Sequence, residues 1–143
     1  MHFVPTNISN ADKKIIASGA KRIEMLKIAL PNKKYLVDDR EISRGGVSYM
    51  IHTVESIFKQ FPDDHLYLLI GLDLLADITK WERFSEIIDL CNIIVSYRRI
   101  DDMMDTLERL MVNENSLKSI ISTDPGIFHS SSYGKIYLEK TSS

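Results

Sequence analysis

Short apolar runs alternate along the chain with longer segments whose apolar residues recur at helical spacing. Five segments carry the apolar runs that predict strands, at 2–4, 35–37, 65–70, 92–97 and 135–140. Four segments have apolar residues three and four positions apart and predict amphipathic helices, at 19–30, 48–61, 84–91 and 101–112. Near-continuous apolar strands separated by amphipathic helices are typical of a parallel sheet with helices on both faces. The pattern therefore predicts an α/β fold.

The length and composition fit one ordinary globular domain. The chain has 143 residues, of which 44% are hydrophobic and 27% are charged, so we expect a single domain over 1–143. The apolar runs are too short to span a bilayer, and we expect neither a membrane partner nor a signal peptide. Cys91 is the single cysteine. It excludes an intramolecular disulfide and favours a reducing, cytoplasmic location.

Charge is distributed unevenly along the chain. The net charge is −2, yet residues 1–34 carry seven lysines and arginines against two acidic residues. Such a basic lobe suits the phosphates of a small ligand, whereas binding to a nucleic-acid duplex usually needs an overall basic balance. We therefore expect no nucleic-acid partner. The alternative for each single lysine is an ordinary solvated helix face.

The strongest candidate site follows the apolar strand at 65–70. That strand runs into Gly71 and Asp73, and the single tryptophan, Trp81, comes shortly after. Ligands of open α/β sheets bind at the carboxyl ends of the strands, where glycine permits close approach and aspartate can bond ribose hydroxyls. The segment thus predicts a nucleotide-binding edge. The competing interpretations are that Asp73 caps a helix and Trp81 covers the edge of the core.

Familiar catalytic motifs are missing from the sequence. It contains no Gly-x-Ser-x-Gly, no paired Cys and His signature and no phosphate-binding Walker loop. Its four histidines, His2, His52, His65 and His129, lack the spacing of metal ligands. We therefore predict no catalytic residue and no metal ligand in this chain, and expect its function to come from groups that position a ligand.

Four ordered blocks carry a family resemblance: VDDREIxRGGxSY at 37–49, LLIGLDLL at 68–75, KWxxF at 80–84 and NIIV at 92–95. In this order and near this spacing they resemble the bacterial nicotinate-nucleotide adenylyltransferase family. The resemblance covers nearly the whole chain. It implies a Rossmann-like nucleotidyltransferase fold, incomplete at both ends, that transfers an adenylyl group from ATP to nicotinate mononucleotide with Mg²⁺. The products would be deamido-NAD and pyrophosphate. Whether the protein forms a homo-oligomer stays open.

The resemblance also assigns roles to single positions. Trp81 would stack on the pyridine ring, and the backbone N–H groups at Tyr49 and Met50 would hold the nicotinate carboxylate, since a helix start suits an anion. Thr6 lies in a loop that would also meet this substrate. On the nucleotide side, Gly71 and Asp73 would accommodate the sugar, and Arg98 would lie near ATP; its plain alternative is an exposed loop charge.

The chain departs from the family pattern in its phosphate-binding parts. The family's Gly-x-Phe-Asp-Pro-x-His-x-Gly-His motif is not found in the sequence, nor is its phosphate-binding segment after the last strand. Met50 and Thr6 also replace the residues usual there. We therefore expect little turnover from the chain as given. The alternatives are a non-catalytic remnant that binds a nicotinate nucleotide or a partner chain, and an unrelated α/β interaction module.

Overall fold

The computed structural model describes residues 1–9, 15–113, 115–122 and 134–141. The chain forms two compact units, Met1–Thr53 and Val54–Ser143, called unit 1 and unit 2 below. The expected single domain over 1–143 stays a prediction. In the described part of the chain, no helix combines the length and the apolar character that crossing a membrane requires.

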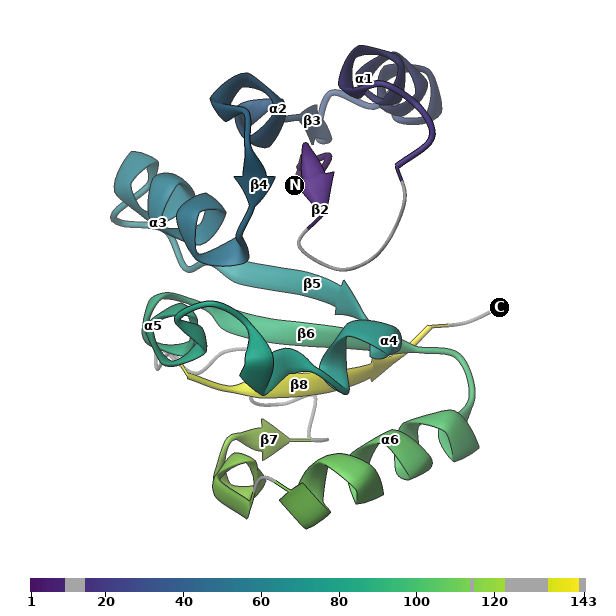
Figure 1. Ribbon diagram of the computed structural model, residues 1–143, viewed down its shortest axis with the longest axis vertical. Helices are drawn as coiled ribbons and strands as arrows, with labels where there is room; N and C mark the ends of the chain where they lie inside the picture. The colour runs from purple at the N-terminus through teal and green to yellow at the C-terminus, as the bar shows by residue number, and fades with distance from the viewer. Residues whose placement is uncertain (10–14, 114, 123–133, 142–143) are drawn as a thin grey trace. The chain divides into compact units, whose positions relative to one another are not determined.

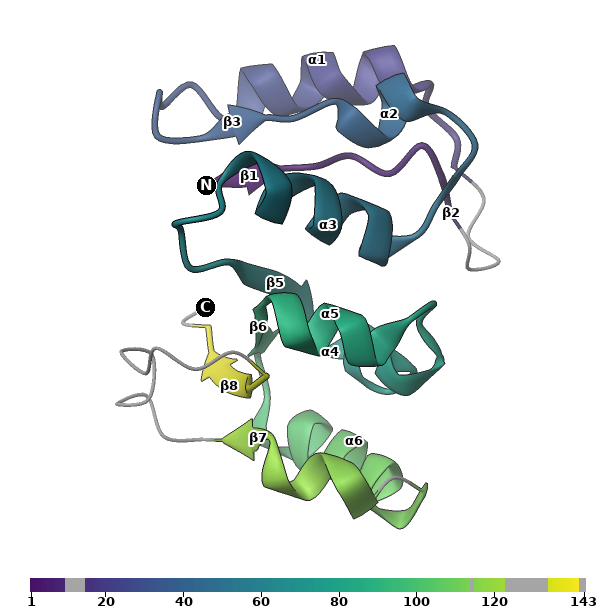
Figure 2. The same cartoon turned by 90° about the vertical axis from the view of Figure 1, so that its left-hand side faces the viewer.

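Unit 1 is built on two pairs of short parallel strands (Figures 1 and 2). Its elements are β1 (His2–Phe3), β2 (Ile8–Ser9), α1 (Gly19–Ala29), β3 (Leu36–Val37), α2 (Arg40–Arg44), β4 (Val47–Ser48) and the start of α3 (Met50–Gln60). Strand β1 pairs with β3, and β2 pairs with β4. The expected helix at 19–30 is confirmed: the Ser18 hydroxyl accepts a hydrogen bond from the Lys21 N–H at its start, and α1 ends just before Pro31.

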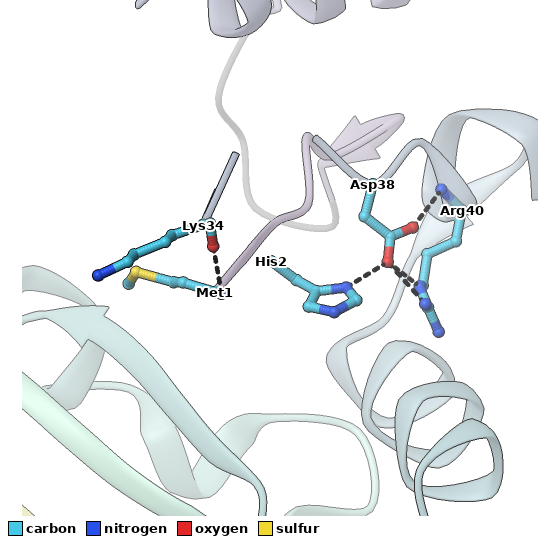
Figure 3. Close-up of polar contacts among 5 residues, drawn as sticks. All are labelled: Met1, His2, Lys34, Asp38 and Arg40. Atoms are coloured by element: carbon cyan, nitrogen blue, oxygen red, sulfur yellow. Dashed lines mark hydrogen bonds and ion pairs between the residues drawn. The ribbon is translucent and has the colours of Figure 1, made fainter. Parts of the chain in front are cut away.

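A polar cluster ties the end of β3 to the start of α2 (Figure 3). Asp38 Oδ2 lies 2.9 Å from His2 Nδ1 and accepts a hydrogen bond of 2.8 Å from Arg40 Nε, while Asp38 Oδ1 accepts one from the Arg40 backbone N–H. Burial alone would raise the pKa of Asp38. The hydrogen bonds from Arg40 and His2 outweigh that effect and lower the pKa to about 2. The neighbouring Asp39 makes no side-chain cap bond with α2.

Unit 2 contains a four-stranded parallel sheet with the order β5, β6, β8, β7. Its elements after α3 are β5 (Tyr67–Gly71), α4 (Leu72–Leu75), η1 (Ile78–Lys80), α5 (Phe84–Leu90), β6 (Asn92–Tyr97), α6 (Ile100–Asn113), η2 (Asn115–Ser119), β7 (Ile121–Ser122) and β8 (Ile136–Lys140). Figure 2 shows α4 and α5 together on one side of the sheet. The expected parallel α/β arrangement is confirmed.

The core of unit 2 lies along β6 and β8. Ile93 and Val95 on β6 and Ile136 on β8 are fully buried, and the adjacent helices contribute Leu75 and Ile87. Each such side chain stabilises the fold by about 1.5 to 3 kcal/mol relative to exposure. Ile93, Val95 and Ile136 come from the apolar runs that predicted strands at 92–97 and 135–140, and the predicted and observed bounds of β6 coincide at 92–97.

Candidate nucleotide site

A pocket opens at the carboxyl edge of the unit 2 sheet. It has a volume of about 730 Å³ and is lined by Gly71, Leu72, Asp73, Ser96, Tyr97, Arg98, Asp102 and Thr141. Gly71 and Tyr97 are the last residues of β5 and β6, and Thr141 directly follows β8. The arrowheads of these three strands point the same way in Figure 1. The pocket therefore lies where parallel sheets bind ligands.

Gly71 brings the backbone and the Asp73 carboxylate close together. It ends β5 and precedes α4, with a φ of −82° that any residue can adopt. A Cβ atom at this position would lie 2.6 Å from Asp73 Oδ1. A side chain at position 71 would therefore displace the Asp73 carboxylate, although the backbone conformation itself would allow one. Asp73 lies in the first turn of α4, and its carboxylate forms part of the pocket wall.

The other side of the pocket is formed by β6, β8 and the start of α6. The Ser96 hydroxyl donates a 3.2 Å hydrogen bond to the Ile70 carbonyl oxygen, which ties β6 to β5. The Thr141 hydroxyl and backbone N–H both donate to the Tyr97 carbonyl oxygen, at 3.1 and 2.9 Å. These bonds hold the strand ends that form the wall of the pocket.

Charged side chains around the pocket match both the nucleoside and the phosphates of a nucleotide. Arg98 supplies a guanidinium group, and Asp73 and Asp102 supply two carboxylates. Carboxylates accept hydrogen bonds from ribose hydroxyls and base amino groups, whereas phosphates are attracted to arginine. The lining can therefore bind a nucleoside near the carboxylates and a phosphate near Arg98.

Trp81 lies apart from this lining. It is half-buried, directly follows η1, and is not among the residues that line the pocket of unit 2. Two residues later Arg83 has a left-handed φ of 55°, and its guanidinium pairs with Glu55 of α3 and with Glu86. A left-handed backbone is uncommon for a residue with a side chain. The exposed ion pairs of Arg83 connect the turn after Trp81 to α3 and α5.

The remaining predicted site residues, Thr6, Tyr49 and Met50, belong to unit 1. Met50 is the first residue of α3, and the Tyr49 ring packs edge to face on His52 with centroids 5.9 Å apart. The Thr6 carbonyl oxygen accepts a 2.5 Å hydrogen bond from Arg22 Nη1. Thr6 and Arg22 also line a separate cavity of about 630 Å³ in unit 1, together with Phe3, Val4, Pro5, Ser9, Ile15, Ile16, Ala17 and Leu26. The predicted substrate residues are thus divided between the units.

Sequence reasoning missed four polar residues that line the pocket: Ser96, Tyr97, Asp102 and Thr141. Three of them could have been found by applying the rule used for Gly71 to the other strands, because they end β6 or follow β8. Asp102 gave no such signal, since an acidic residue at a helix start is usually explained by the helix dipole. Among the described residues, no group of three or more His, Cys, Asp or Glu side chains could hold a metal ion. His129 and the basic residues Lys13 and Lys14 lie outside the described residues.

Known proteins resemble the chain over most of its length. The cytidylyltransferase-like family model matches residues 1–135. A probable nicotinate-nucleotide adenylyltransferase of Legionella pneumophila (strain Lens) is 36% identical over 98 residues, which cover 68% of this chain and 46% of that protein. One of Borreliella afzelii is 31% identical over 126 residues, covering 85% of this chain and 64% of that protein. The resemblance expected from the four sequence blocks is confirmed. The chain spans about half to two thirds of the length of these relatives.

The fold has counterparts among solved structures. Plasmodium falciparum nicotinic acid mononucleotide adenylyltransferase complexed with NaAD matches with a TM-score of 0.65 at 17% sequence identity, and the match covers 99% of this chain and 60% of that one. The same enzyme complexed with APC matches with a TM-score of 0.62 at 16% identity, covering 99% of this chain and 59% of that one. These likenesses confirm the expected α/β nucleotidyltransferase-like fold.

Proposed function

Since the chain belongs to the cytidylyltransferase-like family, we propose that it serves adenylyl transfer from ATP to nicotinate mononucleotide, giving deamido-NAD and pyrophosphate. Relatives of Legionella pneumophila and Aquifex aeolicus, each named a probable nicotinate-nucleotide adenylyltransferase, support this proposal. In such a transfer the nucleotide phosphate attacks the α-phosphorus of ATP. Catalysis then depends on positioning and on neutralising charge.

The observation that carries this proposal is the pocket at the carboxyl edge of the unit 2 sheet. The residues that the sequence proposed for the nucleotide, Gly71, Asp73 and Arg98, come from β5, α4 and the segment after β6, and they line one pocket. In the proposed role Asp73 accepts hydrogen bonds from the ribose, and Arg98 attracts the phosphates of ATP. The N–H groups at Tyr49 and Met50 would hold the carboxylate of the nicotinate ring, and Trp81 would stack on the ring. The loop that carries Thr6 would also meet this substrate.

Mg²⁺ fits this proposal as a companion of ATP. The oxygen ligands offered by Asp73, Asp102, Ser96 and Thr141 are of the type that Mg²⁺ prefers. Mg²⁺ usually combines one or two carboxylates with substrate phosphates. When bound, the ion would neutralise phosphate charge, while the side chains of this chain orient the sugar.

Calorimetric titration of the purified chain with nicotinate mononucleotide tests the proposal. We expect binding that weakens roughly tenfold in Trp81→Ala, because aromatic stacking on a base is worth about 1 to 3 kcal/mol. Trp81→Phe is the matched control and should retain much of the affinity. Binding that is indifferent to Trp81→Ala would dispose of the stacking role.

A second candidate function is binding of a nicotinate nucleotide without turnover. The observation that favours it is the lining of the unit 2 pocket, whose carboxylates and guanidinium group suit binding of a nucleotide. A pyrophosphate-release assay with ATP and nicotinate mononucleotide separates the two candidates. Rapid pyrophosphate formation supports the enzyme, and binding without release supports the non-catalytic role.

A further inference from the structure

Unit 1 contains a buried carboxylate, that of Glu41, to which the proposed function assigns no role. Glu41 lies in the first turn of α2 and is 4% exposed. Its Oε1 accepts a 2.6 Å hydrogen bond from the hydroxyl of Thr53, which is also 4% exposed. Its Oε2 is buried and has no hydrogen-bond partner within the described residues.

The contribution of the Glu41–Thr53 pair to stability does not by itself explain this arrangement. A buried carboxylate loses its hydration, and one hydrogen bond restores only part of that loss. An apolar pair of similar volume would fill the same space without this cost. The position of Glu41 therefore points to a local task that needs a directional bond.

The position of Thr53 in the fold indicates what this task is. Thr53 lies in the first turn of α3, which begins at Met50, so the bond to Glu41 fixes this turn against α2. The strand before it is fixed independently. The buried Ser48 hydroxyl accepts a 2.9 Å hydrogen bond from the Asn7 N–H, and the Asn7 side chain donates to the Gly46 carbonyl oxygen.

We infer that Glu41 is a positioning residue: through its bond to Thr53 it sets the direction of the first N–H groups of α3, and so the preference for a nucleotide whose ring carries a carboxylate. This inference rests on the proposed function, which places the nicotinate carboxylate at Tyr49 and Met50. The first N–H groups of a helix have no partner within the helix and point along its axis. Their direction is therefore set by whatever holds the first turn.

The ratio of two affinities tests this role. Nicotinate and nicotinamide mononucleotide share ribose, phosphate and ring, so their affinity ratio isolates the contact with the carboxylate. By calorimetry, Thr53→Val should lower the preference for the nicotinate form roughly fivefold, because the first N–H groups of α3 lose their alignment and misaligned hydrogen bonds to a carboxylate weaken steeply. Thr53→Ser keeps the hydroxyl and should keep the preference. Glu41→Gln keeps an acceptor for Thr53 and should also keep it, whereas Glu41→Ala should not.

The outcomes separate this inference from the proposed function. A wild-type chain that prefers the nicotinate form, with the same ratio in Thr53→Val, overturns the role of Glu41 alone. A Glu41→Gln variant whose affinity ratio falls as far as that of Thr53→Val would also overturn the role of Glu41. A wild-type chain without any preference overturns the carboxylate contact of the proposed function. Thr53→Ser and Glu41→Gln keep a donor and an acceptor at these positions, so their comparison with the wild-type chain stands even if Glu41→Ala or Thr53→Val does not fold.

Discussion

Replacing Asp38 by Asn should destabilise the chain in a way that depends on pH. The Asp38 side chain is 10% exposed and binds His2 and Arg40, whose side chains are 26% and 15% exposed (Figure 3). Its pKa falls from 3.8 to about 2 in the folded chain. A shift of this size corresponds to at most about 2.5 kcal/mol, at about 1.36 kcal/mol per pKa unit, and solvent screening lowers the expected loss to about 1 to 2 kcal/mol.

The sign of the pH dependence follows from the lowered pKa. The charged form is the one that the fold stabilises, so the contribution is fully present above the unfolded pKa of 3.8 and is lost as the pH falls through about 2. Near pH 3 it should be about half of its neutral value. The free energy of unfolding from urea titrations, followed by circular dichroism, gives the difference between wild type and Asp38→Asn at each pH.

Asp39→Asn is the matched control for this measurement. Asp39 is exposed and makes no side-chain cap bond with α2, so its replacement should change the free energy of unfolding by less than about 0.5 kcal/mol. Equal losses in Asp38→Asn and Asp39→Asn would refute the reasoning. A loss in Asp38→Asn that stays constant from pH 7 down to pH 2.5 would refute it as well, because the bonds would then not depend on the charge.

Three further predictions concern the pocket and the core of unit 2. Gly71→Ala should weaken nucleotide binding roughly tenfold, because its Cβ would lie 2.6 Å from Asp73 Oδ1 and displace that carboxylate. In a chain that already carries Asp73→Ala, adding Gly71→Ala should change the dissociation constant little further. Arg98→Gln should weaken binding of ATP more than binding of adenosine, and the difference should shrink at high salt, as calorimetry at two salt concentrations would show. Burial raises the pKa of the Cys91 thiol to about 12, so a thiol reagent at pH 8 should modify Cys91 only after urea unfolds the chain, and rapid modification of the folded chain would contradict its burial.

The longer elements could be predicted from the sequence because their apolar patterns are the cause of their burial. The run at 92–97 became β6 with the same bounds, and the helical stripe at 101–112 became α6 (Ile100–Asn113). The strand expected at 65–70 is displaced, since β5 spans Tyr67–Gly71. In β5 the pairing with β6 sets the register, from Tyr67 opposite Asn92 to Gly71 opposite Ser96.

Three of the short elements, β2, β4 and α4, could not be predicted in this way. Strands β2 and β4 have two residues each, and α4 has four, which is too few for any periodicity. The two strands form because distant segments of the chain pair, as Ile8 does with Val47. Gly45 and Gly46 separate α2 from β4, and both residues have the positive φ that glycine tolerates, at 72° and 68°.

Some residues of the candidate site could be predicted from the local sequence pattern, whereas others could be found only from tertiary contacts. Gly71 and Asp73 could be found because they directly follow an apolar strand, and the pocket brings them together with Arg98. Glu41 could not be found, because a glutamate in a short polar segment is expected in solvent, and only the fold shows it buried against Thr53. A hydrogen bond between residues twelve positions apart leaves no periodic trace in a sequence. The groups proposed to touch a ligand were therefore recognisable by position, whereas the group proposed to orient them became visible only through its burial and its bond.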